Sequence, residues 1–276
     1  MSRLLKSDSA LRAIIPNIAA VAEGAASWMQ RLEPFLCSAE DRLEVAIDRG
    51  ISALASPQQL HLAKIAVAWD AWFNAIPSLD LVVTPTGFAV TSNNNLAPAS
   101  RDRVAAAREQ ARKSADNALL RIIHSLVVSG DWSKSPVTTL ADPVELSKFF
   151  PEAESDFSLY SSLQSDIHFA EASIVSEYFS PRLLDWWHHA TLHADSELVS
   201  PEDLSALSAF RVAVVSVVRK ESHSVWPNVA EVIRILSHSP KCRSALLFAL
   251  SYNGKRLLKR SAVFENDKDS SGFFFV

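Results

Sequence analysis

The chain has 276 residues and a formal net charge of −4, and hydrophobic residues make up 48% of it. This is enough apolar material for one large domain or two smaller ones. The acidic balance argues against a nucleic-acid clamp, since such proteins cluster Lys and Arg against phosphates. The two cysteines, Cys37 and Cys242, form neither a disulfide framework nor a zinc motif. We therefore expect a protein of a reducing compartment that uses no cofactor.

The segment before residue 80 has apolar residues at helical spacing, interrupted by candidate caps and prolines. Its clearest start signal is Ser56-Pro57-Gln58-Gln59. Ser can cap a helix, Pro suits the first helical position, and Gln59 can reach back to the cap. Pro77 is expected to close the helix that follows. The pattern predicts four helices here, at about residues 7–15, 20–32, 34–50 and 57–76.

Residues 81–91 change character, because β-branched residues flank the turn signal Pro85-Thr86-Gly87. This pattern predicts a β-hairpin at about 81–91. A long helix is then expected from near Ser100 to Gly130. Basic residues from Arg101 to Arg121 decorate it. DNA contact is one interpretation of this face, but we favour a solvated face with pairs such as Glu109 and Arg112, or a subunit contact.

Four segments of the first half have counterparts, in the same order, in the second half, which indicates an internal duplication. The predicted fold class is mainly α, with two similar helical-bundle repeats. The first repeat covers residues 1–128 and carries the hairpin, 129–140 form a linker, and 141–276 form the second repeat with a short strand in its aromatic tail. The matched pairs are Leu11–Pro16 with Leu146–Pro151, Phe35–Glu40 with Asp166–Glu171, Ser56–Leu60 with Ser200–Leu204, and the helices after Pro98 and Pro227.

Two groups of residues could carry chemistry. His189 and His193 are spaced i, i+4, as is the pair Asp185 and His189, so a helix would place them on one face as metal ligands do. Incidental His pairs are more common, and the His-x-x-x-His interior contains no Glu. Glu40 and Glu171 match across the repeats, but such residues more often face solvent or pair with Arg. We therefore assign no catalytic, cofactor-binding or metal residue and expect no enzyme.

Seven tryptophans occur in the chain. Trp28, Trp69 and Trp72 stand at helical spacing beside Ala and Leu and are expected in the core. Trp186 and Trp187 are adjacent, so both cannot face inward on one side of a helix. One of the two is therefore expected at an interface.

The segment Val82–Val104, with Thr84-Pro-Thr-Gly-Phe88 leading into Pro98-Ala-Ser100, resembles a family of uncharacterised proteins from tailed phages and prophages. Phe264-Glu-Asn266 and the later Ser-Gly-Phe-Phe resemble the end of that family. Its two degenerate helical repeats look like head–tail connector (adaptor) proteins. The resemblance implies strand addition at candidate interface residues, which are Val82, Val83, Thr84, Phe88, Val90, Phe273, Phe274 and Phe275.

By this resemblance, the chain is expected to be a virion structural protein made in the bacterial host cytoplasm. Its partners would be further copies in a homo-oligomeric ring and portal or tail components, with no membrane and no sequence-specific nucleic acid. Two alternatives stay open. One is a helical protein-binding module without an assembly role, and the other is a metal-dependent hydrolase using His189, His193 and a carboxylate.

Overall fold

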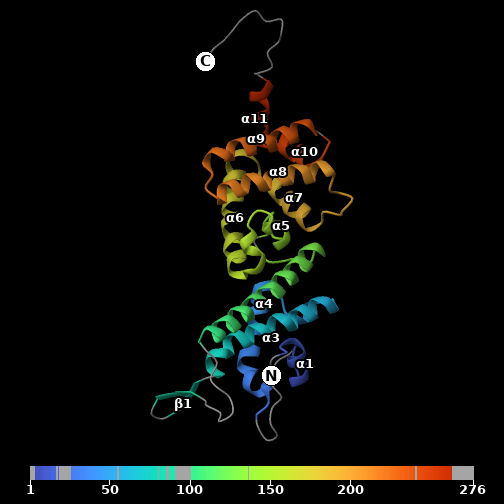
Figure 1. Cartoon of the computed structure of the whole chain (residues 1–276). Helices are drawn as coiled ribbons and strands as arrows, with labels where there is room; N and C mark the ends of the chain where they lie inside the picture. Colours follow the sequence, from blue (N-terminus) through green and yellow to red (C-terminus); the bar gives the residue numbers. More distant parts are fainter. Residues whose placement is uncertain are drawn as a thin grey trace, which may run out of the picture. The chain divides into compact units, whose positions relative to one another are not determined.

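The structure is a computed structural model of the chain, shown in Figure 1. It describes residues 4–16, 18, 26–54, 56–79, 81–84, 87–90, 101–135, 137–239 and 241–262. These residues are mainly helical, which confirms the predicted fold class at that level. Across the described ranges, no helix combines the length and the hydropathy that a membrane crossing requires.

The chain divides into two compact units. The first contains residues 1–135 and 142–161, and the second contains 136–141 and 162–276. These limits differ from those of the predicted repeats and linker. Trp132 and the segment Thr138–Ala141 are buried, so residues of the predicted linker contribute to cores. The two-repeat organisation itself stays a prediction from the sequence.

Helices form most of the first unit. It contains α1 (Asp8–Ile14), α2 (Trp28–Ile47), the 3-10 helix η1 (Ile51–Ala53), α3 (Pro57–Leu79), α4 (Arg101–Val128), α5 (Pro143–Ser147), the 3-10 helix η2 (Pro151–Ser155) and the first turn of α6 (Phe157–Tyr178). Figure 1 shows α3 and α4 side by side, and α3 also packs against α2. The face that α3 buries is rich in alanine, which lets helices approach closely: Ala63, Ala66, Ala68, Ala71 and Ala75.

Two predicted helix boundaries are wrong, and both involve proline. One helix, α2, runs through Pro34 where two were expected, and α3 continues past Pro77. A proline inside a helix removes one backbone hydrogen bond. In α2 the buried Leu32 and Leu36 on either side of Pro34 keep the helix packed through that position. In α3 the loss falls in the last turn, where little helix remains to be disrupted.

Two short strands follow α3. β1 (Leu81–Thr84) pairs antiparallel with β2 (Gly87–Val90), with Leu81 opposite Val90 and Val83 opposite Phe88. The strand pair stands between the two long helices α3 and α4 in the sequence. The strand that the sequence predicts in the aromatic tail lies outside the described residues.

The second unit contains most of α6, then α7 (Pro181–Leu192), α8 (Pro201–Val218), α9 (Ser222–His238), α10 (Arg243–Leu250) and α11 (Tyr252–Ala262). Two Ser-Pro pairs start helices here: Ser180 caps α7, and Ser200 forms a capping box with Asp203 at the start of α8. The core is aromatic. Trp187 stacks on Phe210 with ring centroids 4.3 Å apart, and Phe179 meets both rings and Phe248 edge-on.

Buried carboxylates bind backbone segments in both units. Glu171 of α6 accepts hydrogen bonds from the Thr139 backbone N–H (2.7 Å) and hydroxyl (2.6 Å), and its other oxygen lies 3.1 Å from His188 Nε2. Arg211 of α8 donates to the carbonyl of the same Thr139 at 2.7 Å. In the first unit the buried Glu40 accepts from the Leu4 N–H at 2.9 Å. The two matched glutamates therefore bind backbone, rather than facing solvent as expected.

Replacing Glu171 with Ala is expected to lower the free energy of unfolding by about 3 kcal/mol, because the buried N–H of Thr139 loses its acceptor. Glu171→Gln, which keeps one acceptor oxygen, is expected to cost less. Urea denaturation followed by circular dichroism measures both changes. The control is Asp166→Ala, an exposed acid on the same helix. An equal effect of the two alanine variants would contradict this role for Glu171.

Candidate functional site

Five of the eight predicted interface residues lie in the strand pair. Val82, Val83 and Thr84 belong to β1, and Phe88 and Val90 belong to β2. Among the described residues this sheet has two strands, so each strand has one hydrogen-bonded neighbour. The other three predicted residues, Phe273, Phe274 and Phe275, lie outside the described residues. The strand pair is therefore the part of the predicted interface that can be placed.

His189 and His193 lie at the end of α7, as the sequence predicts, and their ring centroids are 4.6 Å apart. The His189 ring stacks on Trp186 at 5.2 Å. Burial lowers the pKa of His189, and the neighbouring His193 and Arg243 lower it further. Within the described ranges no three His, Cys, Asp or Glu side chains are grouped so that they could hold a metal ion. The hydrolase alternative therefore gains no support from this geometry.

A pocket of about 420 Å³ lies beside this His pair, between α7, α10 and the loop before α8. We call it the arginine pocket. The guanidinium of Arg243 lies 4.1 Å above the ring of Trp186, in cation–π contact with it. The pocket is lined by Arg182, Asp185, Trp186, His189, Leu198, Arg243 and Leu247. The sequence carries no local signal for this pocket, because its two arginines are 61 positions apart.

The expectation that one tryptophan of α7 would lie at an interface is wrong, since both are buried: Trp186 is 5% exposed and Trp187 is 0% exposed. The helix is covered on two sides. Trp187 faces the aromatic core, whereas Trp186 is covered by Arg243 and His189. Adjacent residues on a helix can both be buried when neighbours pack on both sides.

The carboxylate of Asp203 supports the arginine pocket from within the core. Its Oδ1 accepts hydrogen bonds from Trp186 Nε1 (3.1 Å) and from the backbone N–H (2.7 Å) and hydroxyl (2.5 Å) of Ser244. Its Oδ2 accepts from the Ser200 hydroxyl at 2.8 Å. Burial alone would raise the pKa of Asp203, but the bonds from Ser244, Ser200 and Trp186 outweigh burial and hold it below its ordinary value. The charged carboxylate therefore holds α7 and α10 against α8.

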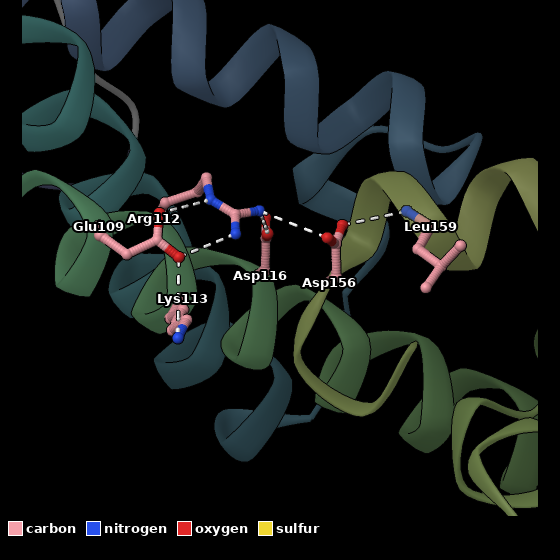
Figure 2. Close-up of polar contacts among 6 residues, drawn as sticks. All are labelled: Glu109, Arg112, Lys113, Asp116, Asp156 and Leu159. Carbon is pink, nitrogen blue, oxygen red and sulfur yellow. Dashed lines mark hydrogen bonds and ion pairs between the residues drawn. The ribbon is translucent and has the colours of Figure 1, made fainter. Parts of the chain in front are cut away.

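A second charged cluster lies on α4, in the first unit (Figure 2). Arg112 reaches Glu109 at 3.0 Å and Asp116 at 3.3 Å, and Asp156 lies 3.6 Å away. Asp156 also accepts a hydrogen bond from the backbone N–H of Leu159, at the start of α6. The expected pairing of Glu109 with Arg112 is confirmed, and Arg112 has a further partner beyond its own helix.

Within this cluster, Asp116 has a raised pKa. Burial raises its pKa to about 6, the carboxylates of Asp156 and Asp70 add to the rise, and Arg112 opposes it. Folded Asp116 therefore keeps its proton to a higher pH than the unfolded chain does, so that folding takes up a proton between about pH 4 and pH 6.

Residues 55–139 match a protein family of unknown function (DUF6712). The match contains α3, β1, β2 and α4, and with them the strand pair. No curated protein and no solved structure matches the chain. The family match assigns no activity, ligand or partner to this protein.

The proton uptake at Asp116 predicts that stability falls as pH rises from about 4 to 6, by about 1–2 kcal/mol once solvent screening of this partly exposed side chain is allowed for. Asp116→Asn is expected to remove that part of the pH dependence, because the amide does not titrate. Thermal or urea unfolding at pH 4, 5, 6 and 7 measures the slope. Asp102→Asn, an exposed position on the same helix, is the control. An unchanged slope in Asp116→Asn would exclude Asp116 as the source.

Proposed function

We propose that this protein is an assembly protein that acts as a homo-oligomer, as a head–tail connector or adaptor of a phage or prophage virion. Its proposed partners are further copies of the chain in a ring and portal or tail components of the virion. In this proposal the protein is not an enzyme and binds neither membrane nor a specific nucleic-acid sequence.

The observation that carries the proposal is the strand pair β1–β2. Each strand has one hydrogen-bonded neighbour within the described chain, and the proposal assigns the outer edge of each to pairing with a further strand. A strand edge presents backbone N–H and C=O groups that another chain can pair with. Strand addition is a common mode of protein recognition because the main-chain bonds supply affinity.

The virion part of the proposal rests on the resemblance of Val82–Val104 to tailed-phage proteins. That segment falls inside the region that matches the family of unknown function. It also contains β2, most of β1 and the start of α4. The residues that carry the resemblance are therefore the same residues that would carry self-association.

A second candidate function is a helical protein-binding module without self-assembly. Exposed apolar side chains on the second unit favour it, among them Leu250 (73% exposed) and Tyr252 (81% exposed). Exposed apolar residues that gather on one surface are typical of protein interfaces. The two functions differ in whether the purified chain associates with itself.

Light scattering over a concentration series separates them. The assembly proposal expects a discrete multiple of the 30.3 kDa chain mass, or a shift toward one as concentration rises. A mass of one chain at every concentration would count against self-assembly and favour the binding module.

Replacing residues 81–90 with a Gly-Ser linker of equal length is expected to lower the mass of the particle, because the strand edges are removed. The helical circular dichroism signal is expected to stay unchanged. Val83→Lys is expected to weaken association at least ~10-fold, since a charged residue on a strand edge opposes strand addition. The control is Val128→Lys, at an exposed valine of α4. A hairpin-free chain with the wild-type mass would contradict this interface.

A further inference from the structure

Two arginines of the arginine pocket lack an acidic partner in the described part of the chain. Arg182 has neither a hydrogen bond nor an ion pair there, and Arg243 has its cation–π contact with Trp186. Some other arginines of the described chain are paired, such as Arg42 with Asp70 and Arg234 with Glu231. The lining contains two arginines and one acid, Asp185, so its net charge is positive. The pocket therefore suits an anionic group.

The pocket opens onto an apolar surface. Arg243, Leu246, Leu247 and Leu250 are spaced i, i+3, i+4 and i+7 along α10, and this spacing places them on one face of the helix. Leu246 and Leu250 are exposed, and Leu198 at the pocket wall is 66% exposed. We call this combined surface, the pocket and the outer leucines of α10, the arginine–leucine surface. Its chemistry fits a segment that carries both carboxylates and large apolar side chains.

The sequence of residues 264–276 has this chemistry. It contains three acids, Glu265, Asp267 and Asp269, against the single base Lys268. The acids are followed by three consecutive phenylalanines at 273–275. These residues lie outside the described part of the chain, so the complementarity is one of charge and hydrophobicity.

We propose that the arginine–leucine surface of one copy docks residues 264–276 of a second copy. This inference rests on the proposed self-assembly and names a contact for it. Carboxylates of the segment pair with Arg182 and Arg243, whose planar guanidinium groups bind carboxylates through two hydrogen bonds. The phenylalanines cover the leucines of α10 and Leu198. Because the surface and the segment differ, the contact is head-to-tail, which closes into a ring or extends into a filament.

The support behind Trp186 explains why this surface is preformed. Asp203 holds the indole N–H from the core side, so the ring has a fixed position under Arg243. The pocket charge comes from arginines, which stay protonated at all working pH values, whereas the pKa of His189 is lowered and this imidazole is neutral near pH 7. Docking is therefore expected to depend on salt more than on pH above about 7.

The test uses a fluorescein-labelled peptide of residues 263–276 and the full chain, with binding followed by fluorescence polarisation. The wild-type chain is expected to bind the peptide. A charge-reversed chain that carries both Arg182→Glu and Arg243→Glu is expected to bind it at least ~30-fold more weakly. A peptide with Glu265→Lys, Asp267→Lys and Asp269→Lys is expected to bind the charge-reversed chain better than the wild-type chain. That rescue also shows that the reversed chain is folded. Lys241→Glu with Lys255→Glu makes the same charge change at exposed positions outside the pocket and serves as control.

Light scattering on the same variants separates this contact from the proposed function. The proposal expects that reversing the pocket or the segment alone lowers the mass, and that mixing the two variants restores association. The docking site is overturned if the wild-type and pocket-reversed chains bind the peptide equally, or if neither chain binds it. If the wild-type chain still associates with itself in that case, self-assembly stands without this contact. Peptide binding by a chain that stays monomeric at every concentration overturns docking between copies together with the self-assembly.

Discussion

The buried carboxylate of Asp203 is the interaction on which the second unit depends. It caps α8 through Ser200, receives the indole N–H of Trp186 from α7, and binds the first turn of α10 through Ser244. A buried charge is unfavourable unless donors surround it, and here both oxygens have them. Because these donors come from three separate helices, satisfying one charge sets the positions of all three. The arginine pocket lies where α7 and α10 meet in that arrangement.

Buried polar side chains that are hydrogen-bonded to another segment also occur at positions that match between the two predicted repeats. Glu40 and Glu171 are both buried, and each accepts a hydrogen bond from the backbone of an earlier segment. At the third position of the matched helices stand Gln59 and Asp203, both buried, with Ser125 and Ser244 as hydrogen-bond partners. The duplication itself stays a prediction from the sequence. A buried polar group with defined partners also specifies which segment packs where.

The interior and the surface of the protein therefore have contrasting chemistry. Inside, the carboxylates Glu171 and Asp203 have several donors each. The outer edges of β1 and β2 and the guanidinium of Arg182 have no such partners within the described chain. Groups left unpaired in this way gain most from a neighbouring molecule. This contrast is the physical reason behind the proposal that the protein acts by association.

The sequence by itself determined the mainly α fold and the helix starts at Ser56 and Ser200, because capping and helical periodicity act within a few residues. The helices that continue through Pro34 and Pro77 depend instead on burial against neighbouring helices. Tertiary structure also decided that Trp186 and Trp187 are both buried, since packing on two sides of α7 is not encoded locally. The arginine pocket belongs to the same class: residues 182–198 meet residues 243–247 because Asp203, from a helix between them in sequence, binds both α7 and α10.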